Sequence, residues 1–172
     1  MTSTARIETP RLILRTVTLA DADNIAPIWN LDGPPLSPAE AQARIHWMRA
    51  NQQQNGPGKL VYLGLVIIAR DTGEFIGCCG LDRDKGHPVL FYWLKRNYRG
   101  QGLATEAARA VLDYAFTVLA LLRVDGATAF DNLASRRIME KIGMRYLGLD
   151  EEGGHFFTIT REDYSQHKEP GL

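Results

Sequence analysis

The sequence feature that most constrains this chain is a basic, glycine-containing turn between an apolar strand-like run and a long amphipathic pattern. The run ends with YWL at residues 92–94, and the turn reads RGQGLA at residues 99–104. A helical pattern opens at Leu103 or Ala104 and places one apolar stripe at Ala107, Ala108, Val111, Leu112, Ala115, Phe116 and Leu119. The chain is therefore expected to pass from a buried strand, through a tight turn, into a helix that packs on a core.

The composition of this turn indicates an anion site. Gly100 and Gly102 let the backbone turn and keep side chains away from the first helical amides. A helix start carries about half a positive charge, and Lys95, Arg96 and Arg99 add full charges nearby. The turn is therefore predicted to hold a phosphate. An ordinary strand-to-helix turn with a solvated basic face is the alternative.

Two common phosphate loops do not fit this turn. A dinucleotide fingerprint that starts at Gly100 would need a third glycine where Thr105 stands, and the Gly-Lys-Ser/Thr ending of a nucleoside-triphosphate loop is absent. The pattern that does fit is R-x-x-G-x-A over residues 99–104, with TEA following at 105–107. It resembles the pyrophosphate loop of the GCN5-related N-acetyltransferase (GNAT) superfamily. With the residues on either side, the stretch resembles the RimJ/RimL-type branch of that superfamily.

The resemblance implies that the chain binds acetyl-coenzyme A. A second segment, NLASRRIMEKIGM at residues 132–144, resembles the family's other cofactor-contacting segment. There the Asn132 side chain would bond the pantetheine arm, and Ser135 would lie near the thioester sulfur. Asn132 also suits the N-cap of its own helix, and its carbonyl and amino groups could serve both partners. The implied cofactor contacts are Trp93, Leu94, Lys95, Arg99, Gly100, Gln101, Gly102, Leu103, Ala104, Thr105, Asn132 and Ser135.

The sequence departs from the family pattern at two catalytic positions. Met139 stands where many members carry a tyrosine that protonates the leaving thiolate, and residues 89–91 lack the glutamate that many relatives place on the strand before the glycine turn. Ser135 is therefore the remaining candidate for the general acid, although it could equally be an ordinary first-turn residue. His87, Asp82 and other polar residues lie just before that strand, where a turn is the simpler interpretation.

Other parts of the site are less specific in the sequence. A backbone amide of the strand Phe91 to Lys95, left free where the next strand splays away, is expected to polarise the thioester carbonyl. The elements that wall the acceptor site in related enzymes carry Trp29, Tyr62, His155 and Phe156, but aromatic residues at such places are usually part of the core.

The order of predicted elements agrees with the fold that the resemblance implies, which is α/β (α+β), a mixed, mostly antiparallel central sheet flanked by helices on both faces. The resemblance covers residues 9 to about 164, and a chain of 172 residues suits a single domain over 1–172. Helices are predicted after the capping box at 18–21, at 38–53, from 103 or 104, and from 132 to about 142. Strands are predicted at 9–16, 60–69, 74–81, 89–94, 123–130, 144–149 and 156–160.

Composition excludes several classes of protein. Lys plus Arg and Asp plus Glu are 20 each, so a broad basic surface for nucleic acid or an anionic membrane is not expected. No signal segment or apolar run of about 20 residues appears, which favours a cytoplasmic protein. Cys78 and Cys79 are adjacent on a predicted strand and point to opposite faces, so neither a disulfide nor a metal site is expected, and both are interpreted as core residues.

The sequence is thus expected to encode an acetyl-coenzyme A-dependent N-acetyltransferase whose acceptor, a primary amine, attacks the thioester directly. A non-catalytic coenzyme A-binding module and an enzyme that transfers a longer acyl group are the alternatives. Without a strand carboxylate as base, an α-amino group is favoured over lysine, because deprotonation at pH 7 costs roughly 1.1 kcal/mol for the first and roughly 4.6 kcal/mol for the second. A protein N-terminus or a small-molecule amine fits, and the chain is expected to be a monomer or a homodimer.

Overall fold

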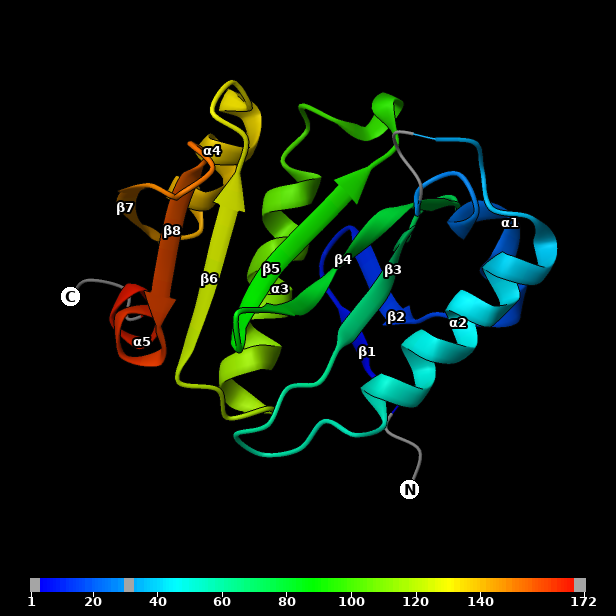
Figure 1. The fold of residues 1–172 in the computed structure, drawn as a ribbon, viewed down its shortest axis with the longest axis horizontal. Helices are drawn as coiled ribbons and strands as arrows, with labels where there is room; N and C mark the ends of the chain where they lie inside the picture. The colour runs from blue at the N-terminus through cyan, green and yellow to red at the C-terminus, as the bar shows by residue number, and fades with distance from the viewer. Residues whose placement is uncertain (1–3, 30–32, 169–172) are drawn as a thin grey trace.

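The computed structural model describes residues 4–29 and 33–168, which form a twisted mixed sheet with helices on both faces (Figure 1). Within these residues the strand order is β1-β2-β3-β4-β5-β6-β8-β7, and neighbouring strands are antiparallel except for the parallel pair β5 and β6. The predicted fold class is confirmed. The strands are β1 Arg6–Glu8, β2 Leu12–Thr16, β3 Leu63–Ala69, β4 Phe75–Asp84, β5 His87–Leu94, β6 Arg123–Thr128, β7 Arg145–Leu149 and β8 His155–Thr160.

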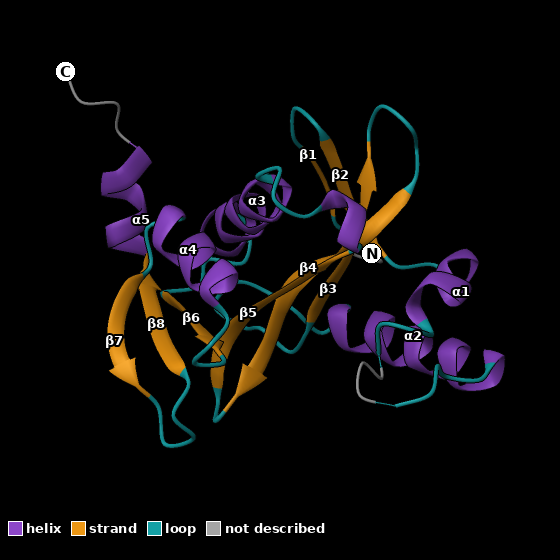
Figure 2. Cartoon of the chain, turned by 90° about the horizontal axis from the view of Figure 1, so that it is seen from above, coloured by secondary structure: helices purple, strands orange, loops and turns teal. Residues whose placement is uncertain are grey.

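Helices cover the sheet from two sides (Figure 2). On one side α3 packs above the centre of the sheet and α4 packs nearer the edge, on β6 and β7, and on the other side α2 packs against β3 with α1 beside it. A large apolar core lies under α3 and a smaller one lies under α2. The helices are α1 Ala22–Ile25, α2 Pro38–Gln52, α3 Leu103–Thr117, α4 Leu133–Lys141 and α5 Arg161–Lys168, with short 3-10 turns η1 Leu19–Asp21 and η2 Arg96–Tyr98.

The apolar stripe predicted for residues 107–119 explains how α3 sits on the sheet. All seven stripe residues are buried, and they contact the side chains of β5 that point to the same face, such as Leu90 and Leu94. Alternate residues of β5, Phe91 and Trp93, point to the opposite face and contact the core under α2. The strand β5 therefore contributes side chains to both layers of the fold.

Two elements were missed in the sequence. The strand predicted at 9–16 is the second half of a hairpin, in which Ile7 of β1 pairs with Leu14 of β2 and the chain turns around Pro10. The short strand β1 lies before residue 9, where the first predicted strand begins. The helix α5 is short and polar, and Tyr164 is its buried apolar anchor, so no periodic stripe indicated it.

The parallel pair β5 and β6 separates soon after it forms. The two strands have a single recorded pair, Val89 with Asp125, after which β5 and β6 diverge toward their carboxyl ends (Figure 1). The residues of β5 beyond Val89 therefore face an opening that is bordered by the start of α3 and by α4. No helix in the described ranges is both long enough and apolar enough to cross a membrane.

Candidate active site

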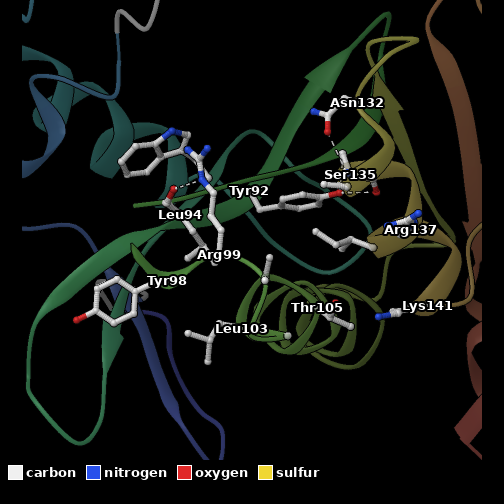
Figure 3. A pocket seen from close by; sticks show the side chains of 16 residues that line it. Tyr92, Leu94, Tyr98, Arg99, Leu103, Thr105, Asn132, Ser135, Arg137 and Lys141 are labelled. Carbon is white, nitrogen blue, oxygen red and sulfur yellow. Dashed lines mark hydrogen bonds between the residues drawn. The ribbon is translucent and has the colours of Figure 1, made fainter. Parts of the chain in front are cut away.

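A cavity of about 460 Å³ lies at the opening between β5 and β6 (Figure 3). Its walls come from the end of β5, the glycine turn, the first turn of α3 and one face of α4. Of the residues predicted to contact the cofactor, all but Lys95 and Gln101 line this cavity. The two sequence segments singled out, 99–105 and 132–135, are thus brought together across the opening, although some 30 residues separate them in the chain.

The glycine turn presents backbone groups to this cavity. Gly100 and Gly102 have φ angles of 75° and 77°, which favour glycine, and Gly102 is the N-cap of α3. The first bond of the helix runs from the amide of Glu106 to the carbonyl of Gly102, 3.0 Å apart. The amides of Leu103 and the next two residues come before Glu106 in the helix, so they have no hydrogen-bond acceptor within it. These free amides form the positive end of the helix dipole. The turn therefore has the features of an anion site.

Contacts from the hairpin of β1 and β2 hold the glycine turn in place. Arg11 donates from Nη1 to the carbonyl of Gln101 at 2.9 Å and from Nε to Glu106 at 2.7 Å. Glu106 also accepts a hydrogen bond from the hydroxyl of Thr9 at 2.6 Å. Gln101 itself donates to the carbonyl of Asn97 at 3.0 Å, so its side chain ties the turn together instead of lining the cavity.

The positive charges at the cavity are only partly those expected. Lys95 pairs with Glu74 at 3.2 Å, outside the cavity. Arg99 lines the cavity and donates from Nε to the carbonyl of Leu94 at 2.9 Å, which joins the turn to the end of β5. Arg137 and Lys141 of α4 add two further cations to the wall (Figure 3). Their spacing of four residues places them on one helix face, a signal that the sequence carried but that was not used.

Ser135 takes part in a hydrogen-bonded pair that the sequence did not reveal. Its Oγ lies 2.7 Å from the hydroxyl of Tyr92, which also donates to the Ser135 carbonyl at 3.2 Å (Figure 3). Burial raises the pKa of Tyr92 to about 12, so the phenol keeps its proton at neutral pH. Asn132 accepts from the amide of Ser135 at 3.1 Å and caps α4, as expected. Tyr92 was interpreted only as the end of a strand, because residues 43 positions apart meet only in the folded chain.

Met139, at the position where many family members carry a tyrosine, does not line the cavity. It is buried in the core under α3, next to Gly126, whereas the neighbouring Ile138 is among the residues of α4 that line the cavity. The expectation that α4 supplies no phenol holds for both positions. A phenol is nevertheless present at the site, since Tyr92 brings one from β5.

A second cavity, of about 340 Å³, lies on the opposite face of the sheet beside α1 and α2. It shares Tyr92 and Trp93 with the first cavity, so the two cavities meet at the end of β5. Among the aromatic residues considered for the acceptor wall, Trp29 and Tyr62 line it. His155 instead lies buried in another cluster, with its ring nitrogens 3.1 Å from the Tyr146 hydroxyl and the Phe130 carbonyl.

The cysteines lie as predicted, on opposite faces of β4, and both are free. Cys79 is in the large core, whereas Cys78 borders the second cavity. Burial raises the pKa of the Cys78 thiol to about 12, which leaves it protonated and unsuited to nucleophilic attack. Within residues 4–29 and 33–168, no group of three or more His, Cys, Asp and Glu side chains is placed to hold a metal ion.

Comparison with known proteins identifies the family. The family model of the acetyltransferase (GNAT) domain matches residues 11–145, which include the glycine turn, Tyr92 and all of α4. This chain belongs to the GNAT acetyltransferase family. The predicted resemblance is confirmed.

Relatives of this GNAT acetyltransferase include bacterial and fungal proteins. An uncharacterized N-acetyltransferase p20 of Bacillus licheniformis is 28% identical over 91% of this chain and 97% of its own length. The FsC-acetyl coenzyme A-N(2)-transacetylase of Aspergillus fumigatus is 35% identical over 81% of this chain and 66% of its own length. The structure of Mycobacterium smegmatis RimJ in complex with CoA-disulfide has a TM-score of 0.73 at 21% identity and covers 93% of this chain and 88% of RimJ, so the two share a fold.

Proposed function

We propose that this GNAT protein is an acetyl-coenzyme A-dependent N-acetyltransferase whose acceptor is a primary amine. The observation that carries the proposal is the meeting of two cavities at Tyr92 and Trp93. One cavity ends at an anion-binding turn and the other is largely apolar, so a thioester and an amine held in them would approach each other through the gap between β5 and β6. Holding two reactants in this way is a large part of what an enzyme contributes.

The first cavity fits coenzyme A in its chemistry. The open side of the turn suits a pyrophosphate, because no heavy atom beyond the chain neighbours lies within 4 Å of a Cβ placed on Gly100. Arg137 and Lys141 would balance the negative charge of phosphate groups. The amino group of Asn132 would remain for the pantetheine arm, since the cap uses its carbonyl. Acetyl-coenzyme A, when bound, supplies the activated acetyl group.

The backbone of β5 would polarise the thioester carbonyl. Lys95 donates its amide to Ile76 of β4, and alternation along a strand then directs the amides of Tyr92 and Leu94 to the other edge. In agreement, the carbonyl of Leu94 points to that other edge, where it accepts a hydrogen bond from Arg99. Because the pairing with β6 stops at Val89, the amides of Tyr92 and Leu94 face the gap and are the donors that we assign to this role.

Ser135 would donate a proton to the departing sulfur, and Tyr92 would be hydrogen-bonded to Ser135. The short contact between the two hydroxyl groups allows the phenol to replace the proton that Ser135 gives up. The phenol would then regain a proton from solvent, which receives the one that the amine loses as the amide forms. A relative whose name includes acetyl coenzyme A-N(2)-transacetylase supports nitrogen as the acceptor atom.

The test is turnover. Purified protein is given acetyl-coenzyme A and a panel of amines, and the free thiol and the acetylated product are both quantified. Acetylation of at least one amine, together with saturable coenzyme A binding, is the expected result. Binding without turnover of any amine would contradict the proposal and favour the non-catalytic module. Mass analysis of ligand copurified with the protein would expose a preference for a longer acyl group.

A further inference from the structure

The second cavity contains a polar group without a partner. Tyr62 is only 1% exposed, and its buried hydroxyl makes no hydrogen bond. The ring is fixed by stacking on Phe91, with ring centres 6.1 Å apart, and by the edge of Trp47 at 5.0 Å. A Cβ on Gly64 would lie 2.6 Å from this hydroxyl, so a glycine leaves the space that the phenol occupies. Buried polar groups are nearly always satisfied, so a missing partner points to a ligand.

The rest of the cavity is apolar apart from one carboxylate. Trp29, Phe91 and Trp93 supply half-buried aromatic walls, and Asp82 is the single charged side chain among the described residues that line it. Asp82 is exposed and lies at the rim on β4, beside β5. Asp82 beside apolar walls suits a compound that is cationic at one end and apolar elsewhere. The Arg44 guanidinium is not a lining residue, but it lies 4.6 Å from the centre of the Trp29 ring.

We infer that the second cavity selects a primary amine carried on a compact, uncharged, apolar body, with one hydroxyl or carbonyl group that bonds to the phenol of Tyr62. This inference rests on the proposed function, since the amine is the acceptor that meets the thioester at Tyr92 and Trp93. Asp82 attracts the ammonium form, which loses its proton to solvent before the neutral amine attacks, and the aromatic walls bury the body. Burial raises the pKa of Tyr62, so its hydroxyl stays neutral and can either donate or accept.

The experiment compares acceptors that differ in body but share the amine. The small-molecule arm uses phenethylamine, tyramine and ethanolamine, and the peptide arm uses short peptides that begin with Leu, Asn or Asp. The expected result in at least one arm is a kcat/KM at least tenfold higher for the apolar acceptor than for the polar one, which is the order that burial of one apolar side chain gives. The arm that responds identifies the source of the amine. Equal rates across both arms would overturn the inference.

Two variants with matched controls test the walls. Trp29→Ala should reduce the preference for apolar amines at least fivefold. Phe130→Ala should preserve it, because Phe130 is exposed, stacks on His155 and lines neither cavity. Tyr62→Phe should lower kcat/KM threefold to tenfold for acceptors with a hydroxyl or carbonyl group and less than twofold for phenethylamine. Tyr164→Phe is the control, because it removes a hydroxyl that donates to the carbonyl of Arg109. It should change kcat/KM neither for acceptors with a hydroxyl or carbonyl group nor for phenethylamine. An equal effect of Tyr62→Phe on all acceptors would contradict the assignment.

A binding measurement separates this inference from the proposed function. Trp29 and Trp93 line the cavity, so an amine that enters it should change the tryptophan fluorescence without any coenzyme A present. Saturable change with phenethylamine, weakened at least fivefold in Trp29→Ala and absent with ethanolamine, would support the inference even if no amine is acetylated. Saturable change of equal affinity with both amines, or none with either, would overturn it whatever the turnover shows.

Discussion

At the scale of single residues, the proposed mechanism assigns the proton donor for the leaving sulfur to Ser135 and Tyr92. The serine lies on α4 and the phenol on β5, and their oxygens are 2.7 Å apart across the opening in the sheet. The raised pKa of Tyr92, about 12, keeps the phenol protonated throughout the neutral range. The pair is therefore protonated and able to donate a hydrogen bond to the developing thiolate, and it is unsuited to act as a base at neutral pH.

Substitution of the two residues tests this role. Ser135→Ala and Tyr92→Phe should each lower kcat at least threefold and leave the affinity for coenzyme A within twofold, as expected for an interaction made mainly in the transition state. The fall has a natural limit, because a thiol of reference pKa about 8.5 leaves fairly well unaided. Initial rates at saturating acetyl-coenzyme A, together with calorimetric affinities, measure both quantities. A fall of less than threefold in both variants would show that the pair is structural.

At the scale of elements, the hairpin of β1 and β2 fixes the glycine turn through Glu106. Burial acts to raise the pKa of Glu106, but hydrogen bonds from Thr9 and Arg11 outweigh it and hold the pKa below its ordinary value. A carboxylate with a lowered pKa contributes stability above its unfolded pKa, about 4.3, and that contribution is lost as the pH falls through the folded pKa. The attachment of the turn should therefore weaken in acid.

Glu106→Gln tests this attachment. At pH 7 the variant should have a lower melting temperature than the wild type, and the difference should shrink as the pH is lowered from 5 to 3, because the wild type then loses the same charge. Affinity for coenzyme A at pH 7 should fall threefold to tenfold, since the turn is no longer held by Arg11. Thermal unfolding across this pH range gives the first result and calorimetry the second. A difference in melting temperature that is independent of pH would contradict the account.

The sequence predicted those elements whose signals are local. The glycine turn, the stripe of α3 and the cap at Asn132 are each specified by residues within about one or two turns of each other. The strand β1 and the polar helix α5 depend on contacts across the fold. The same holds for the Tyr92 and Ser135 pair and for the role of Asp82 at the rim of the second cavity, because spacing along the chain contains no information on which residues meet across a gap.

At the scale of the whole molecule, the twisted sheet separates two chemically different spaces and joins them at one point. The side of α3 and α4 provides cations and free helical amides, whereas the side of α1 and α2 provides aromatic walls. Both spaces border Tyr92 and Trp93 at the end of β5, where β5 has parted from β6. This arrangement depends on the glycine turn, because the turn starts α3 and forms the end of the first cavity to which we assign the pyrophosphate.

Gly102→Asp is the change that addresses this dependence. An added Cβ would meet only the Arg11 guanidinium, 3.5 Å away, so the fold should persist, while a carboxylate would occupy the space and oppose the positive field meant for phosphate. Gly73→Asp is the matched control. Gly73 has a φ angle of 70°, has no neighbouring atom within 4 Å of an added Cβ, and lies in the turn before β4, outside the first cavity.

Calorimetric titration of coenzyme A into the wild type and these two variants is the most direct test of the account. The expected result is saturable binding by the wild type and by Gly73→Asp, and affinity at least a hundredfold weaker for Gly102→Asp, with similar melting temperatures for the two variants. Equal affinity for the wild type and Gly102→Asp would show that the glycine turn does not hold the cofactor.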